Sequence, residues 1–111
     1  MDSILNTIKK LLGIDSEDDN FDTDITVLIN STIPALAQIG IGPPNGFVVT
    51  AADDKWVDRL ADNQINVEGI KTYINLKVKL IFDPPTISTV IEAFNKSISE
   101  IEWRMMLAIE T

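Results

Sequence analysis

Apolar residues recur at helical spacing, roughly 100° per residue, along most of the chain, and this pattern predicts five helices. The predicted helices run from about Ser3 to Leu12, from Thr23 to Ile39, through Trp56, Val57 and Leu60, from Val67 to Phe82, and from Ile87 to Ile109. The expected fold class is therefore all-α: a small bundle of about five helices with a long amphipathic C-terminal helix. Because the chain has 111 residues and no convincing internal boundary, we expect a single domain spanning residues 1–111.

The chain also carries the signals at which helices start and stop. Asp2 or Ser3 can cap the first helix, and Gly13 can end it. The run Thr50-Ala51-Ala52-Asp53 is a variant of the capping box and predicts the start of the short third helix. Asp83-Pro84-Pro85 ends the fourth helix, because a residue that precedes proline avoids the helical conformation.

The fourth predicted helix is apolar around most of its circumference. One stripe is formed by Val67, Ile70, Ile74, Val78 and Ile81, and a second by Tyr73, Leu76 and Leu80. A helix with so narrow a polar arc is usually central, so it should pack against neighbours on two sides or against another subunit. The second stripe, Tyr73, Leu76 and Leu80, is accordingly our first candidate for a subunit interface.

The last predicted helix carries two kinds of apolar position. A single stripe, expected to face the core, contains Ile87, Val90, Ile91, Phe94, Ile98, Ile101, Met105, Ala108 and Ile109. Trp103, Met106 and Leu107 lie off this stripe, and an exposed apolar cluster that includes a tryptophan is typical of a protein interface. We therefore expect these three residues to dock on a partner or a neighbouring subunit. The alternative is that they cover the end of the bundle.

Between the second and third helices, Gly40 to Gly46 contains glycines and prolines that exclude regular structure. The apolar residues Phe47, Val48 and Val49 follow this loop. Two interpretations remain open: the segment projects and contacts a neighbouring subunit or a tail-side protein, or it is a short strand folded back on its own helices.

Composition narrows the possible chemistry. The sequence contains no cysteine and no histidine, which removes thiolate nucleophiles, disulfides and the commonest general base and metal ligand. We expect no catalytic residues, no cofactor and no metal. The net charge of −8 disfavours sequence-specific binding to nucleic acid. The N-terminus lacks the pattern of a signal peptide, and no apolar stretch approaches the ~20 residues that span a bilayer, so no membrane association is expected.

Neither the acidic segment nor the glycine-rich segment has the pattern of a known binding loop. Asp15 to Asn20 lacks the ligand spacing and mid-loop glycine of a calcium loop, so it is interpreted as a solvated loop. Gly40 to Gly46 lacks the Lys-Ser/Thr of a phosphate-binding loop. The paired carboxylates at Asp53-Asp54 and at Glu100 and Glu102 are interpreted as solvated surface.

Three lysines of the fourth helix, Lys71, Lys77 and Lys79, are spread over roughly 240° and form no single basic stripe. They are expected to keep the exposed arc of the helix soluble or to pair with acids of a neighbour.

The order of these segments resembles a known family. Tyr73-Ile74-Asn75-Leu76-Lys77-Val78-Lys79-Leu80-Ile81-Phe82 runs into Asp83-Pro84-Pro85 and then into a long helix that contains Glu102-Trp103-Arg104. Upstream, Phe21-Asp22-Thr23 starts a helix that ends in Gly40-Ile41-Gly42-Pro43, followed by Gly46-Phe47 and Trp56. This order is similar to that of the head–tail connector (adaptor, or head-completion) proteins of siphovirus-type bacteriophages over nearly the whole chain.

The resemblance implies a small helical protein without catalytic residues that forms a ring of about twelve copies below the portal. It implies that the ring joins the DNA-filled head to a stopper or tail-completion protein and lets double-stranded DNA pass through its lumen without specific binding. The expected location is the neck of the virion, after synthesis in the host bacterial cytoplasm. The alternatives are another phage neck or tail-completion protein, or a small helical protein-binding regulator.

Overall fold

The computed structural model describes residues 3–39, 49 and 67–110. For Val67 and residues 108–110 it describes the backbone alone. The described elements are four helices: α1 (Ile4–Leu11), α2 (Asp22–Ile39), α4 (Val67–Phe82) and α5 (Ser88–Glu110). The all-α prediction is thus confirmed for this part of the chain. The predicted third helix, through Trp56, Val57 and Leu60, lies outside the described residues.

Local signals place the ends of the first helix. Ser3 Oγ accepts a hydrogen bond from the backbone N–H of Asn6 at 3.2 Å, which confirms Ser3 as the N-cap. At the other end Gly13 adopts a φ of +83°, its N–H donates to the Lys10 carbonyl, and the Ile14 N–H donates to the Lys9 carbonyl. This pair of bonds is the Schellman arrangement, which favours glycine because a side chain is strained at that φ.

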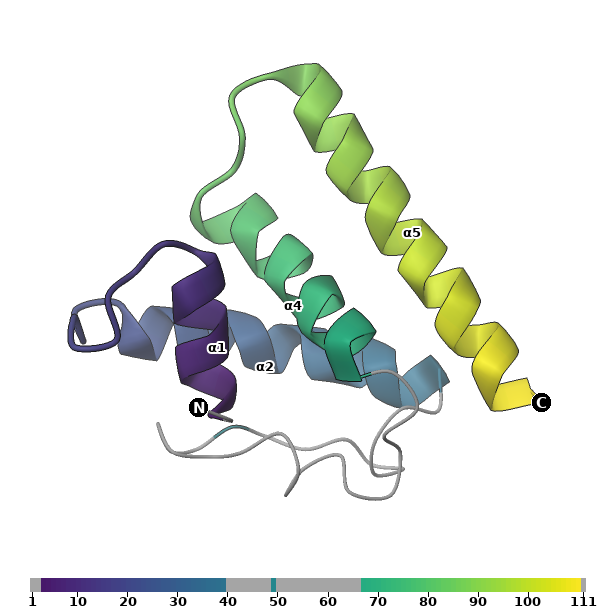
Figure 1. The fold of residues 1–111 in the computed structure, drawn as a ribbon, viewed down its shortest axis with the longest axis horizontal. Helices are drawn as coiled ribbons and strands as arrows, with labels where there is room; N and C mark the ends of the chain where they lie inside the picture. The colour runs from purple at the N-terminus through teal and green to yellow at the C-terminus, as the bar shows by residue number, and fades with distance from the viewer. Residues whose placement is uncertain (1–2, 40–48, 50–66, 111) are drawn as a thin grey trace.

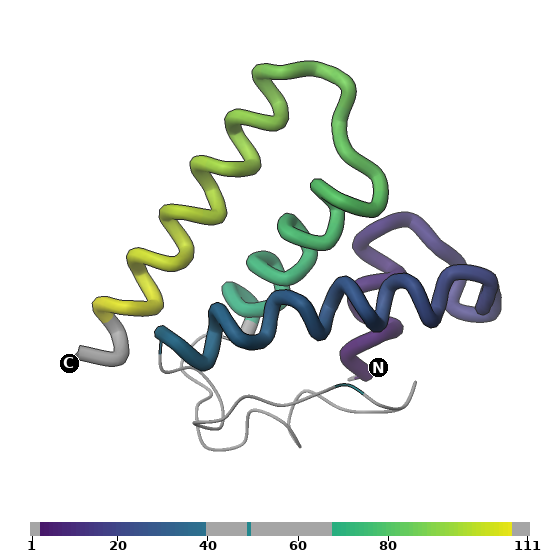
Figure 2. The backbone as a smooth tube through the Cα atoms, turned by 180° about the vertical axis from the view of Figure 1, so that it is seen from behind, coloured from purple at the N-terminus to yellow at the C-terminus, as the bar shows by residue number. Residues whose placement is uncertain are grey.

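The helices form two layers. α2 lies across α1 and α4, while α4 and α5 run side by side and are joined at the upper end of the molecule (Figure 1; Figure 2). α4 contacts α1, α2 and α5, so the prediction that this helix is central is confirmed. α4 ends at Phe82, directly before Asp83-Pro84-Pro85, as the sequence predicts.

The core lies where the two layers meet. It contains Ile4, Leu5, Ile8, Ile25, Ile29, Ile33, Leu36, Val49, Ile70, Tyr73, Ile74, Val78, Ile98 and Met105. Each fully buried aliphatic side chain of this kind contributes about 1.5–3 kcal/mol relative to an exposed one. The core therefore depends mainly on isoleucines from α1, α2 and α4, and only two of its buried residues, Ile98 and Met105, come from α5.

The predicted core-facing stripe of the last helix is wrong for its first two residues, whereas the next two, Ile91 and Phe94, are half-buried. Ile98 and Met105 are buried, but Ile87 is 60% exposed and Val90 is 36% exposed. The reason is geometric: the connection after Phe82 carries the first turns of α5 beyond the end of α4, where no other described helix covers them (Figure 1). The stripe is continuous along the sequence, but its burial increases from the exposed Ile87 and Val90 to the buried Ile98 and Met105.

Candidate interaction surfaces

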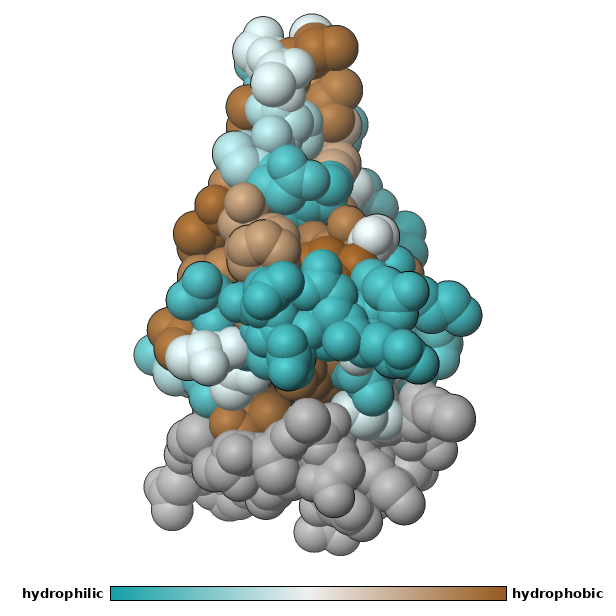
Figure 3. All heavy atoms as spheres, turned by 90° about the vertical axis from the view of Figure 1, so that its left-hand side faces the viewer, coloured by the Kyte–Doolittle hydropathy of each residue, from teal (hydrophilic) through white to brown (hydrophobic). Residues whose placement is uncertain are grey.

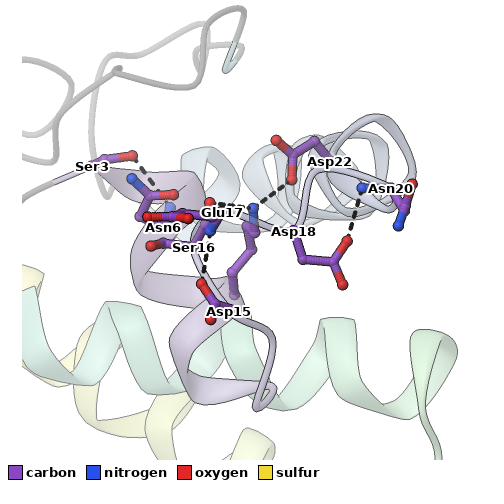
Figure 4. Close-up of polar contacts among 9 residues, drawn as sticks. Ser3, Asn6, Asp15, Ser16, Glu17, Asp18, Asn20 and Asp22 are labelled. Atoms are coloured by element: carbon purple, nitrogen blue, oxygen red, sulfur yellow. Dashed lines mark hydrogen bonds and ion pairs between the residues drawn. The ribbon is translucent and has the colours of Figure 1, made fainter.

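The acidic segment, residues 15–24, holds six carboxylates and no lysine or arginine. Asp15 Oδ1 accepts from the Glu17 N–H at 2.9 Å, and Asp18 Oδ1 accepts from the Asn20 N–H at 3.1 Å (Figure 4). These carboxylates organise turns of their own loop, and most of the segment is exposed, which agrees with its interpretation as a solvated loop. Within the described residues no group of three or more Asp, Glu, His or Cys side chains is placed to hold a metal ion.

A buried lysine anchors this segment to the bundle. Lys9 is 1% exposed; its Nζ lies 2.8 Å from Asp22 Oδ1 and donates to the Ser16 carbonyl oxygen at 3.1 Å. Asp22 and Ser16 approach this point from the start of α2 and from the loop before it (Figure 4). In sequence terms, Lys9 is simply a basic residue in the last turn of α1, where it suits the negative end of the helix. Its role as a buried link from α1 to α2 comes from the tertiary structure.

A second polar contact joins α4 to α5. Tyr73 is fully buried, and its hydroxyl donates to Glu102 Oε2 at 2.7 Å while accepting from Lys77 Nζ at 3.2 Å. Burial first, and then the hydrogen bond to Glu102 and the charge of that residue, raise the pKa of Tyr73 well above its usual range. The hydroxyl therefore stays neutral and remains a donor. Glu102 is thus engaged in an inter-helix bond, which corrects its interpretation as plain solvated surface.

This contact removes Tyr73 from the predicted subunit interface. Its side chain is fully buried within the chain, because α5 returns alongside α4 and covers it. Leu76 and Leu80 are partly buried and pack against the core, so each keeps only part of its surface for a neighbour. The second stripe of α4 therefore faces mainly the chain's own helices.

The lysines of α4 find their partners within the same helix or directly after it. Lys71 Nζ lies 3.2 Å from Glu68, and Lys79 Nζ lies 3.5 Å from Asp83. These exposed pairs are worth little to stability. They favour the expected solubilising role over pairing with the acids of a neighbour.

Val49 is the described member of the predicted Phe47–Val49 contact segment. It is 2% exposed; its N–H donates to Asn30 Oδ1 at 2.7 Å, and its carbonyl accepts from Asn30 Nδ2 at 3.1 Å. Val49 is thus held against α2 of its own chain, because the Asn30 amide offers both a donor and an acceptor. This contradicts a projecting role for Val49. Phe47 and Val48 lie outside the described residues.

The C-terminal patch, Trp103, Met106 and Leu107, is exposed as the sequence predicts. The exposed fractions are 60% for Trp103, 45% for Met106 and 44% for Leu107. Trp103 precedes the buried Met105 by two positions, so it points about 160° away from the side of α5 that faces the core. A cluster of this kind is typical of a binding surface.

Four further apolar residues around the connection from α4 to α5 are exposed, although the sequence did not predict it. They are Phe21, Ile81, Ile87 and Val90, which are 42%, 65%, 60% and 36% exposed. Phe21 reaches α4 through an edge-to-face contact with Phe82, with ring centroids 5.4 Å apart. Periodicity assigned Ile81, Ile87 and Val90 to buried stripes. The one available signal was their position next to Asp83-Pro84-Pro85, where a chain reversal leaves helix ends uncovered.

The described surface also has two depressions around the start of α4. The larger, of about 870 Å³, is lined by Asn6, Thr7, Lys10, Leu11, Ile14, Asp15, Ser16, Glu68, Lys71 and Thr72. The smaller, of about 230 Å³, is lined by Glu68, Gly69, Thr72, Ile101 and Arg104. Charges of both signs line the larger groove.

The described part of the chain is an all-α bundle whose main external features are exposed apolar patches and an acidic segment, as in a protein that assembles with others. The sequence matches the family described as phage connector protein over residues 4–111. Because this match covers nearly the whole chain, the chain belongs to the phage connector protein family. That membership assigns it a structural role at the head–tail connection of a phage. No curated protein and no solved structure matched the chain.

Proposed function

We propose that this chain is a non-enzymatic adaptor subunit that forms a ring of about twelve copies below the portal. The ring would join the DNA-filled head to the stopper or tail-completion protein, in the neck of the virion, after synthesis in the host bacterial cytoplasm. The observation that carries this proposal is family membership over residues 4–111.

Two physical features support the proposal. The exposed patches on α5 and at the α4–α5 corner give the chain apolar surface that water disfavours and that assembly would bury. The net charge of −8 suits a lumen through which double-stranded DNA passes, because a negative wall repels phosphate. No helix among the described residues is long and apolar enough to cross a membrane.

The surfaces that we propose for assembly are chosen by the exposed fraction of their apolar side chains. The C-terminal patch is the candidate for docking on the portal or on a neighbouring subunit. Leu76 and Leu80 are secondary candidates for a subunit interface, because they are already partly covered.

Electron microscopy of the full chain, with and without the portal protein of the same phage, tests the proposal. A ring seated on the portal with an open axial channel is the expected result. A monomer or dimer in both samples would contradict it and favour a protein-binding regulator, whereas a ring that binds only tail-side proteins would favour another neck or tail-completion role. Hydrolase and nuclease screens on the same samples should show no turnover.

A further inference from the structure

The buried core is divided unevenly between α5 and the other helices. Apart from Ile98 and Met105, every buried apolar residue that the structure describes belongs to α1, α2 or α4 or is Val49. A buried ion pair of Lys9 also joins α1 to α2. Most of the residues from 88 to 107 are exposed. The helices α1, α2 and α4 therefore share most of the described core, and α5 packs against them from one side (Figure 1).

The connection between α4 and α5 gives α5 little further support. It comprises residues 83–87, which lie outside both helices and are exposed except for the partly buried Pro85. Pro84 and Pro85 have no backbone N–H, so neither can donate a hydrogen bond that would fix the angle between the helices. This end of the molecule projects as a narrow part above a hydrophilic belt (Figure 3). The connection can therefore act as a hinge.

A polar contact holds the C-terminal part of α5 on α4. Glu102 Oε2 accepts a hydrogen bond from the Tyr73 hydroxyl at 2.7 Å, and Lys77 Nζ donates to the same hydroxyl at 3.2 Å. Glu102 lies between Ile98 and Met105 in the sequence, so this bond and the buried apolar side chains act on the same stretch of α5. A hydrogen bond to a charged acceptor is stronger than one between neutral groups, and its loss leaves the buried hydroxyl without an acceptor.

We propose that α5 undocks as a unit about residues 83–87 while α1, α2 and α4 stay folded together, and that the hydrogen bond between Tyr73 and Glu102 is the latch that keeps α5 closed. The C-terminal patch lies on α5 and moves with it. The chain can thus redirect this candidate docking surface without unfolding the rest of the bundle. The opening is a property of the single chain, so it goes beyond the proposed function and is measured without a portal.

Hydrogen exchange of the full chain measures this opening. An undocked α5 is a lone helix, which is marginally stable in water, so its amides exchange whenever it undocks. After correction for intrinsic rates, the amides from Phe94 to Met105 should share one protection factor, roughly tenfold or more below that of the slowest amides of α1, α2 and α4. Equal protection of all four helices would overturn the proposal. A steady fall of protection towards the end of α5 would also overturn it, because that pattern indicates fraying.

A substitution outside α5 separates its opening from unfolding of the whole chain. Gly13→Ala strains the end of α1, where the φ of Gly13 is +83°. It should speed exchange of the slowest amides of α1, α2 and α4 roughly fivefold, because these exchange only when the chain unfolds. The α5 amides should keep their rate, because α1 remains folded when α5 opens. Equal acceleration in α5 would show that α5 opens only with the rest of the chain.

Two matched substitutions in α5 test the latch. Glu102→Ala removes the acceptor of the Tyr73 hydroxyl and should speed exchange of the α5 amides about tenfold. Glu100→Ala makes the same change two positions earlier, at an exposed residue whose partner, Arg104, lies on the same helix, and should speed them about twofold or less. Equal effects of the two substitutions would show that the bond to Tyr73 is not the latch.

Discussion

The ion pair between Lys9 and Asp22 allows a direct test of what holds α1 to α2. Lys9 Nζ lies 2.8 Å from Asp22 Oδ1, and the two side chains are 1% and 29% exposed. A buried charge is costly unless it is paired, because it has lost its hydration. The loss of stability on breaking the pair should therefore depend on which partner is removed.

Asp22→Ala leaves the Lys9 ammonium in the core with the Ser16 carbonyl oxygen 3.1 Å away, and should lower the free energy of unfolding by about 3 kcal/mol. Lys9→Met keeps an apolar stem in the same space and leaves Asp22, in the first turn of α2, without its cation; its Oδ1 is buried, but the side chain as a whole is 29% exposed. There the helix dipole favours an acid, so the expected loss is about 1 kcal/mol. At about 4 °C per kcal/mol, the two variants should melt roughly 12 °C and 4 °C below the unmodified chain.

Thermal and urea unfolding followed by circular dichroism measure both losses. The double variant contains no unpaired charge, so it should be about as stable as Lys9→Met alone. The reasoning is refuted if Asp22→Ala costs no more than Lys9→Met, or if the two losses add in the double variant.

Three further predictions follow from single residues. Burial and Glu102 raise the pKa of Tyr73 above its ordinary 10.0. The neutral Tyr73 hydroxyl therefore makes its whole contribution to the free energy of unfolding below about pH 10. That contribution falls at higher pH, because the tyrosine of the unfolded chain ionises first. Tyr73 is the only tyrosine of the sequence, so as the pH is raised the phenolate absorbance should increase together with the loss of helicity. An increase in absorbance at a lower pH than the loss of helicity would contradict the burial of Tyr73. Gly13→Ala should lower the free energy of unfolding, measured in urea, by about 1 kcal/mol. The loss comes from backbone strain at a φ of +83° alone, because no atom lies within 4 Å of the added Cβ. An unchanged urea midpoint would argue against that strain. Trp103→Ala should change the free energy of unfolding by about 0.5 kcal/mol or less but weaken docking in the neck by about 2 kcal/mol or more. Normal docking with a large fall in Tm would instead place Trp103 in the core.

The positions of the helices could be predicted because they depend on local features of the sequence. α1, α2, α4 and α5 begin and end within one residue or so of their predicted bounds. Ser3 and Gly13 act at the ends of α1 through backbone bonds to residues three to five positions away, so sequence spacing was enough to identify them. The exposure of Trp103 was predictable for a similar reason, since its angle on the helix relative to Met105 is fixed by helical geometry.

Residues whose partners come from distant segments could not be placed in this way. Periodicity grouped Tyr73 with Leu76 and Leu80, but it could not say whether α5 or a neighbouring subunit covers that stripe. Val49 is another example, because its position depends on the amide of Asn30, nineteen residues earlier in the chain. In both cases the sequence does not say which other segment of the chain packs against the residue.

The sequence by itself determined the helices, their ends, the acidic segment and the family to which the chain belongs. The tertiary structure alone decided that Lys9 is buried beside Asp22, that Glu102 binds Tyr73, and that Ile87 stays exposed although it shares a stripe with Ile98. The physical reason is that helical periodicity is a property of one segment and its own hydrogen bonds. Burial is a property of a pair of segments, and it depends on how far each helix extends past its partner.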